Sequence, residues 1–235
     1  MINSFYTAAA SLTEMQKGFD VTANNISNVS SSGYKASEAT FADLIYSNMK
    51  DAQGSNSDLK SGHGAKLDKT DIEMSQGEIQ QTGLPLDYAI LDPNGFFAVQ
   101  KDGRVEYTKN GNFHLTVTQG KNYLTASDGG LVLDSKGQPV TVANENDSSA
   151  AIGVYTFQNS GALERIGNCS FLPTAASGTA TAAVNPELKK GWLEGSNVSI
   201  ADEMASVISL QRAFQMNSKI VQMSDEITQT INSLR

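Results

Sequence analysis

The side chains that most often carry chemistry are scarce in this chain. Among its 235 residues there is one cysteine, Cys169, and there are two histidines, His63 and His114, which lie in unrelated sequence contexts. A zinc site needs clustered Cys and His ligands, and a Cys nucleophile needs a His beside it. The chain also lacks a phosphate-binding G-x-x-x-x-G-K-S/T loop and a G-x-S-x-G nucleophile elbow. We therefore expect no enzymatic activity, no catalytic residue, no metal site and no bound cofactor.

Carboxylates cluster in one stretch of the chain, at Asp68, Asp71, Glu73 and Glu78. Such a cluster either forms a solvated acidic face or serves acid–base catalysis or calcium binding. The solvated face is the commoner outcome, because charged side chains are mostly exposed. His63 lies between two glycines in a polar stretch. We interpret it in the same way, as a solvated side chain and not a ligand.

The overall charge argues against two classes of partner. The chain has 17 Lys and Arg against 25 Asp and Glu, a formal net charge of −8. Nucleic acids and anionic membrane surfaces attract basic proteins, so we expect neither as a partner. No run of apolar residues is long enough to cross a bilayer, so we expect no direct membrane insertion. The first basic residue is Lys17, so we expect any export to proceed without a cleavable signal peptide.

Long helices are predicted at both ends of the chain. Between Ser199 and Leu234, large apolar residues recur mostly three, four or seven residues apart, with no Pro or Gly among them. At about 1.5 Å per residue this helix is about 50 Å long, and it needs a partner to cover its apolar stripe. We predict that this partner is a helix over residues 1–32. It ends near Gly33, because a glycine is suited to the backbone conformation that stops a helix. Their seam consists of Ile2, Phe5, Ala9, Leu12, Phe19, Ala23 and Ile26. We expect a coiled-coil-like pairing, within the chain or between copies.

Polar residues near these helices leave alternatives open. Asn24, Asn25 and Asn28 are poor helix formers late in the first helix. They indicate either a fraying last turn or a polar cluster that fixes the register against neighbouring helices. The cap of the C-terminal helix is equally open, because three residues suit it: Ser196, Asn197 and Ser199.

Two segments connect the first helix to the middle of the chain. Residues 35–50 could form a second short helical piece, with Phe41, Leu44 and Ile45 as its apolar residues. Residues 51–66 are polar and rich in Gly and Ser, which is typical of a flexible linker. We place the end of this linker at residue 69.

The middle of the chain has the period-2 pattern of strands. Residues such as Leu86, Tyr88 and Ile90 alternate with small or polar ones, and glycine-bearing turns such as Asp102-Gly103 separate the runs. The pattern predicts an antiparallel all-β domain over 70–190. The fold class is therefore α+β, with 1–50 and 191–235 forming a helical inner domain.

Two classes of function compete on these grounds. One is a structural subunit whose terminal helices pack into a tube of many copies. The other is a self-contained binding module, in which a β domain is presented on a dimeric coiled coil. A dimer stalk usually uses one end of a chain, whereas both ends carry an apolar stripe here. This feature favours the structural subunit.

Several blocks of the sequence resemble the signatures of the flagellar rod and hook family, and together they span nearly the whole chain. The C-terminal block is most similar to the distal-rod branch, with the proximal-rod branch second. The chain departs from the family pattern at Asp92-Pro93-Asn94 and at Lys109, where Arg is commoner. The blocks are DVTANNISNV (20–29) with GYK (33–35), TGLPLDYAI (82–90) with GFF (95–97), YTKNGNF (107–113), and LEGSNV (193–198) with Glu203-Met204 and QRAFQMNSK (211–219).

The resemblance implies a structural protein that is exported unfolded and then assembles. Its implied partners are copies of itself, joined head-to-tail in a helix, other rod and hook proteins, and the flagellar export apparatus. Its implied location is the flagellar basal body, in the cell envelope. We expect the termini to order on assembly and to supply the interface. The expected interface residues are Phe5, Leu12, Phe19, Asn24, Asn25, Asn28, Asn197, Phe214, Asn217, Ile220, Ile227, Ile231 and Leu234.

Overall fold

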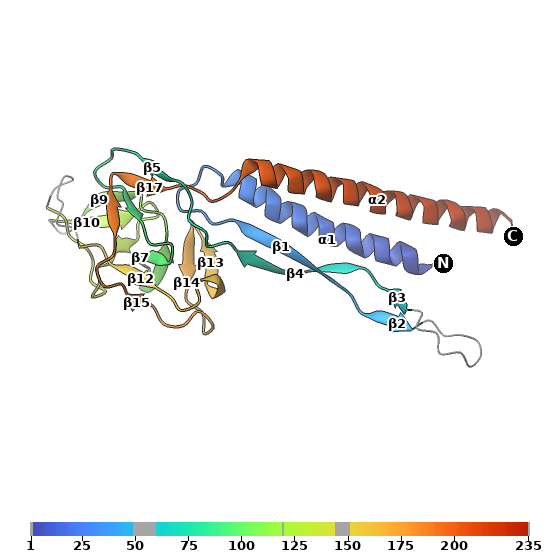
Figure 1. The fold of residues 1–235 in the computed structure, drawn as a ribbon, viewed down its shortest axis with the longest axis horizontal. Coiled ribbons are helices and arrows are strands. Elements are labelled where there is room, and N and C mark those ends of the chain that lie inside the picture. The colour runs from blue at the N-terminus through green and yellow to red at the C-terminus, as the bar shows by residue number, and fades with distance from the viewer. Residues whose placement is uncertain (1, 49–59, 119, 144–150, 235) are drawn as a thin grey trace. The chain divides into compact units, whose positions relative to one another are not determined.

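The computed structural model describes residues 2–48, 60–118, 120–143 and 151–234, and Figure 1 shows its elements. The chain divides into two compact units. Unit 1, the helical unit, comprises Met1–Ile26, Ser37–Asp71 and Ser199–Arg235. Unit 2, the β-rich unit, comprises Ser27–Ala36 and Ile72–Val198. The predicted α+β class is confirmed, with one long helix at each end of the chain and antiparallel strands between them.

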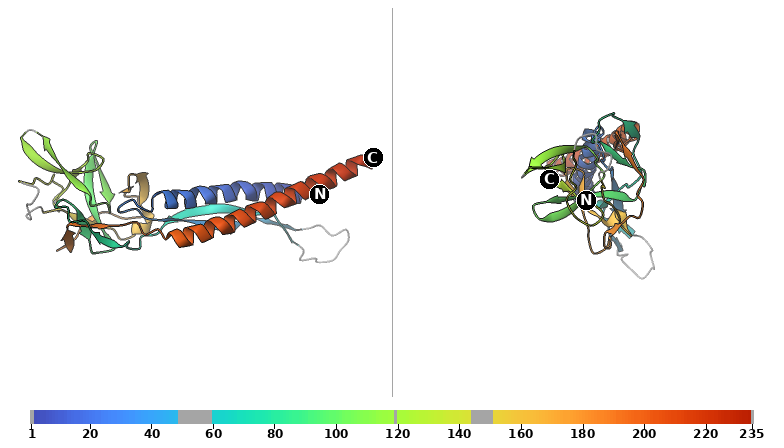
Figure 2. Two further views of the ribbon diagram at one scale, coloured as in Figure 1. Left: turned by 90° about the horizontal axis from the view of Figure 1, so that it is seen from above. Right: turned by 90° about the vertical axis from the view of Figure 1, so that its left-hand side faces the viewer.

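The helical unit contains α1 (Ile2–Ser27) and α2 (Ile200–Ser233), which lie side by side in Figures 1 and 2. They run antiparallel, because Asn25 donates to Glu203 whereas Asn217 reaches Met15, further back along α1. Ser199 is the N-cap, and its side chain accepts a hydrogen bond from the backbone N–H of Asp202. One of the three predicted caps is therefore confirmed.

The prediction of a helical piece over 35–50 is wrong. This stretch contains β1 (Ser37–Asp43) and β2 (Tyr46–Asn48), which pair with β4 (Ala65–Ile72) and β3 (Lys60–Gly62) respectively. The two partner strands lie partly in the predicted linker, so residues 60–69 are not a linker; residues 51–59 lie outside the described residues. The error arises because strand formation depends on a distant partner, which short-range spacing does not reveal.

Strands β1 and β4 of the helical unit lie against α1. A Cβ placed on Gly18 of α1 would lie 2.9 Å from the Phe41 ring and 3.4 Å from the Leu210 side chain. Glu14 of α1 accepts a hydrogen bond from the backbone N–H of Leu67 in β4. Gly18 therefore gives α1 the space to approach both β1 and α2. The first helix ends at Ser27, earlier than predicted, because residues 28–33 form turns that include the bond from Ser31 N to Asn28 O.

The β-rich unit is built on one nine-stranded antiparallel sheet. Its main path has the order β13-β14-β8-β7-β11-β10-β9, and β12 pairs with both β7 and β15. Two smaller pairs complete the unit: β6 (Tyr88–Ile90) with β16 (Leu188–Lys190), and β5 (Ile79–Gln81) with β17 (Trp192–Glu194). The strands of the large sheet are β7 (Gly95–Lys101), β8 (Arg104–Thr108), β9 (Phe113–Thr118), β10 (Lys121–Ala126), β11 (Leu131–Val132), β12 (Val154–Thr156), β13 (Glu164–Gly167), β14 (Ser170–Leu172) and β15 (Thr181–Ala182), and a short 3-10 helix covers Ser160–Ala162.

Both faces of the central strand β7 are covered. Phe97 packs in one cluster with Phe113 and Leu124, whereas its neighbour Phe96 packs in another with Phe171. Successive side chains of a strand point to opposite faces, so these two clusters lie on the two sides of the sheet. Gly95 to Val99 are consequently all buried.

Candidate functional site: a buried polar junction in the β-rich unit

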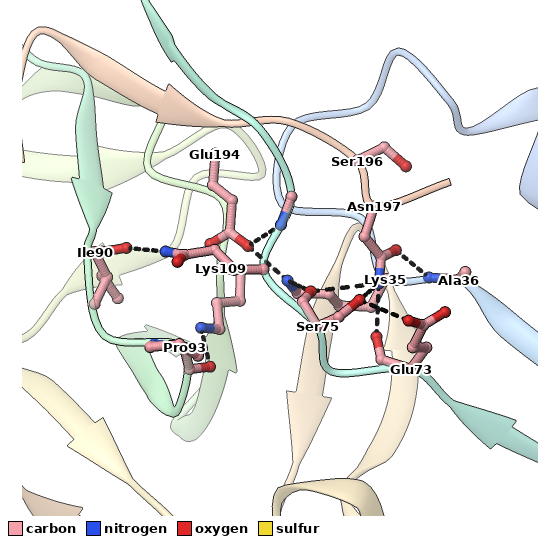
Figure 3. Close-up of polar contacts among 12 residues, drawn as sticks. Lys35, Ala36, Glu73, Ser75, Ile90, Pro93, Lys109, Glu194, Ser196 and Asn197 are labelled. Atoms are coloured by element: carbon pink, nitrogen blue, oxygen red, sulfur yellow. Dashed lines mark hydrogen bonds and ion pairs between the residues drawn. The ribbon is translucent and has the colours of Figure 1, made fainter. Parts of the chain in front are cut away.

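Three segments of the β-rich unit meet at one buried polar site, shown in Figure 3: residues 33–36, residues 73–77 and residues 192–197. The backbone N–H of Gly33 donates to Glu194 O at 2.8 Å, and that of Asn197 donates to Tyr34 O at 3.4 Å. On its other side, β17 pairs with β5. The segment 192–197 therefore lies between two neighbours, one of which comes from the start of the chain.

Gly33 is required at the point where the segment 33–36 enters the junction. Its φ of +70° is a conformation that residues with a Cβ rarely adopt. A Cβ at this position would also come within 2.5 Å of the backbone N of Asn110. The glycine thus brings residues 33–35 against the block at 107–113, and two of the sequence blocks meet here.

An ion pair between Lys35 and Glu194 lies at the centre of the junction. The two side chains are 0% and 1% exposed, and Lys35 Nζ lies 2.5 Å from Glu194 Oε1. Lys35 also donates to Ser75 O at 2.6 Å, and the backbone N–H of Gly77 donates to Glu194 Oε1 at 3.1 Å. Among the described residues, Glu194 Oε2 has no hydrogen-bond partner. Two charges removed from water in this way depend on each other, because removing one side chain would leave the other charge buried without its partner.

Asn197 joins the three segments through its side chain, as Figure 3 shows. Its Oδ1 accepts from the backbone N–H of Ala36 at 2.7 Å. Its Nδ2 donates to Glu73 O at 2.9 Å and lies 3.0 Å from Ser75 Oγ. An asparagine offers both a donor and an acceptor, so one residue can satisfy backbone groups of two other segments.

Lys109 is a second buried lysine. It is one of the two departures from the family pattern, and it contacts the other, Asp92-Pro93-Asn94. Its side chain is 1% exposed, and Nζ donates to Pro93 O at 2.6 Å and to Asp92 O at 3.4 Å. Burial lowers its pKa from an ordinary 10.5 to about 8, while Glu194 raises the pKa, Lys35 lowers it and Asp92 raises it. The two departures at 92–94 and 109 are therefore one structural feature.

Arg165 covers the N-terminal segment from the edge strand β13. Its guanidinium donates to Lys35 O and lies 4.8 Å from the centre of the Tyr34 ring. The roles of Arg165, Lys35 and Glu194 were missed by the sequence interpretation. Lys35 and Glu194 stand inside the blocks GYK and LEGSNV, which was the available signal, but nothing local marks them as a pair.

The predicted interface asparagines are used mostly inside the chain. Asn25 is buried, accepts from Ser37 N and donates to Ser37 O and to Glu203. Asn28 accepts from the Ser31 hydroxyl, and Asn217 donates to Ala213 O. A buried, bonded Asn25 contradicts a fraying turn. It fixes the position of α1 against β1 and against α2 of the same chain.

The predicted apolar interface residues belong to the helical unit, whereas the junction belongs to the β-rich unit. Leu12 and Phe19 of α1 are half-buried, whereas Phe5 is exposed. On α2, no described residue is buried. Its exposed large apolar side chains include Phe214, Ile220, Ile227 and Ile231, and its C-cap residue Leu234 is exposed as well.

The residues first considered for chemistry are divided between the two units. Asp68 and Asp71 of β4 are exposed and pair with Lys66 and Lys69. Cys169 is half-buried, and burial raises the pKa of its thiol. Within the described ranges, no group of three or more His, Cys, Asp or Glu side chains could hold a metal ion. None of the described helices is long and apolar enough to cross a membrane.

Comparison with known proteins identifies the family. Residues 189–234 match the family described as flagellar basal body rod FlgEFG protein, C-terminal. The flagellar basal-body rod protein FlgG of Bacillus subtilis is 33% identical over 264 residues and is covered completely, as is this chain. FlgG of Borreliella burgdorferi is 33% identical, with 100% of this chain and 99% of that protein covered, and the B. subtilis flagellar hook-basal body complex protein FlhP is 28% identical with complete coverage of both. By this full-length similarity, the chain belongs to the family of flagellar basal-body rod proteins.

Proposed function

We propose that this chain is a structural subunit of the flagellar rod that polymerises through its terminal helices into a drive shaft transmitting torque to the hook. The single observation that carries the proposal is the surface of α2. None of the described side chains of this 34-residue helix is buried. Ile227 within the helix is 53% exposed, and the C-cap residue Leu234 is 83% exposed. Helices in proteins are stabilised mainly by packing an apolar face, so this one requires a further partner.

The positions of the exposed residues support a contact between copies. Glu203 and Asn217 of α2 contact α1, and Leu210 lies close to Gly18. The exposed stripe lies elsewhere on α2, with steps of three or four residues, and consists of Met216, Ile220, Met223, Ile227, Ile231 and Leu234. In a helix of 3.6 residues per turn, these members lie about a quarter of a turn around the helix from the α1 side. A neighbouring copy would cover them.

The contacts repeat head-to-tail by a rotation and a rise that do not close, which builds a filament and not a ring. The helical unit forms the tube, and the β-rich unit decorates it. Residues 27–36 and 191–198 belong to the β-rich unit and Ser37–Asp71 belongs to the helical unit, so we propose the helical unit, and not 1–50 with 191–235, as the part that forms the tube. The hydrophobic contacts are proposed at Phe5, Leu12, Phe19, Phe214, Ile220, Ile227, Ile231 and Leu234, with Asn24 and Asn28 beside them. Asn25 and Asn217 orient these surfaces from within the helical unit, whereas Asn197 bonds within the β-rich unit.

The subunit reaches the basal body through the flagellar export apparatus and meets other rod and hook proteins there. It acts without a cofactor and without catalysis, as befits a family of structural rod proteins. We assign it to the distal rod because its C-terminal block is most similar to that branch, and basal-body rod proteins FlgG match over the full chain. A paralogous hook-basal-body role is the second candidate, because FlhP also matches from end to end. Complementation of strains lacking one or the other protein distinguishes the two.

The test of assembly is a pair of matched variants. Ile227→Asp with Ile231→Asp places two charges in the exposed apolar stripe, and Gln215→Asp with Gln222→Asp places the same charges on an exposed polar side of the same helix. Electron microscopy of concentrated purified protein should show filaments for the unmodified chain and the control only. Motility of cells carrying each variant should follow the same division. Normal filaments and motility with the Ile variant would refute the interface.

A further inference from the structure

The four chain connections between the two units converge on few residues of the β-rich unit. The chain crosses between the units after Ile26, Ala36, Asp71 and Val198. Inside the β-rich unit, Asn197 bonds to Ala36 N and Glu73 O, so it ties together the segments that lead to three of the four crossings. Tension carried along these three connections therefore loads this junction.

The two segments that lead to α1 and α2 run parallel. Gly33 N bonds to Glu194 O, and further along both segments Asn197 N bonds to Tyr34 O. The N-terminal helix is attached before Gly33, whereas the C-terminal helix is attached after Asn197. The two attachments thus leave the parallel pair at opposite ends. Pulling the chain termini apart slides the segments along each other and loads all their contacts at once.

The side chains strengthen this arrangement where water cannot compete. The Lys35–Glu194 ion pair crosses between the same two segments, and both groups are buried. Asn197 Oδ1 adds a 2.7 Å bond to Ala36 N. A hydrogen bond to a charged group is stronger than a neutral one, and in a buried site water does not replace it during separation. The segments 33–36 and 194–197 are thus held by backbone and side-chain bonds that share one load.

We propose that residues 33–36 and 194–197 form a mechanical clamp, which keeps the β-rich unit folded when tension is applied between α1 and α2. The inference deepens the proposed drive-shaft function, because a shaft subunit works under load. The clamp is nevertheless a property of the single chain. It is measured without assembly, so its failure and the failure of the polymerisation proposal are distinguishable.

The experiment is single-molecule force spectroscopy on the full chain, held by tags at its two termini. The clamp variants are Asn197→Ala and the double variant Lys35→Met with Glu194→Leu. The control is Val132→Ala in β11, a buried core position outside the clamp, or a second core variant chosen to match the loss of the chemical unfolding midpoint. The event that belongs to the β-rich unit is identified by the length of chain it releases.

We expect the clamp variants to unfold under load about a hundredfold faster than the unmodified chain, because contacts broken in the transition state change the unfolding rate directly. The core variant of equal equilibrium stability should change the rate far less. With attachment points at Asp102 and Lys136, which do not load the clamp, the clamp and core variants should become equal. Equal loss of force resistance in both classes when the termini are pulled would overturn the clamp, and Asn197→Ala alone decides if the double variant does not fold.

Discussion

The two units of this chain cover their apolar residues in opposite ways. In the β-rich unit, Phe96 and Phe97 are 0% exposed and each makes edge-to-face contacts with other aromatic rings. In the helical unit, α2 has no described residue that is buried. The β-rich unit thus packs an aromatic core on both sides of its large sheet within one chain. The helical unit instead leaves large apolar side chains of α2 exposed, and these are the side chains that the proposed assembly would cover.

The largest expected effect on stability comes from the core of the β-rich unit. Phe97→Ala removes a ring whose centre lies 5.1 Å from that of Phe113, and it should lower the free energy of unfolding by about 3–5 kcal/mol. Chemical denaturation followed by near-ultraviolet circular dichroism measures this change. A loss no larger than that of an exposed α2 residue would erase the contrast between the units.

A similar loss is expected at the junction, for an electrostatic reason. Lys35→Met leaves the buried Glu194 carboxylate without its partner and should cost about 3–5 kcal/mol. The double variant with Glu194→Leu removes both charges and should recover much of that loss. A double-mutant cycle from denaturation midpoints measures the coupling. Purely additive losses would mean that the pair does not act as a unit.

Lys109 makes stability depend on pH. Its pKa is about 8 in the folded chain and 10.5 ordinarily. Between pH 8 and pH 10.5 the Lys109 side chain therefore carries its proton in the unfolded chain but not in the folded one. Stability should therefore rise with pH across this window, by about 3 kcal/mol in total, and the contribution is absent below pH 8. Lys109→Met should flatten this slope in denaturation curves recorded from pH 7 to 10.5. An unchanged slope would assign the dependence to another group.

The smallest expected effect lies in the helical unit. Ile227→Ala in the isolated subunit should change the free energy of unfolding by less than about 0.5 kcal/mol, as for other exposed positions. At micromolar concentration, far-ultraviolet circular dichroism should report less helix than the 26 residues of α1 and the 34 of α2 would give. Full helicity in the lone subunit would mean that the helices need no further cover.

Local patterns in the sequence predicted the parts of the fold that depend on neighbouring residues. The apolar spacing after Ser199 predicted α2, and Asp102-Gly103 predicted a tight turn, which the positive φ values of 49° and 78° confirm. The same reasoning failed at residues 37–48, where the strands depend on partners at 60–72. Asn25 was recognised as unusual, but its partners Ser37 and Glu203 could not be named.

The sequence by itself determined the class of fold, the absence of familiar catalytic motifs and the family, because periodicity, composition and signature blocks are properties of residues close together in the chain. Only the tertiary structure decided that Lys35 pairs with Glu194, which is 159 residues away, and that Asn197 joins the surrounding segments. A charge can be buried only where a specific opposite charge and specific backbone groups meet it. Such a meeting is a property of three-dimensional packing, and no spacing along the chain encodes it.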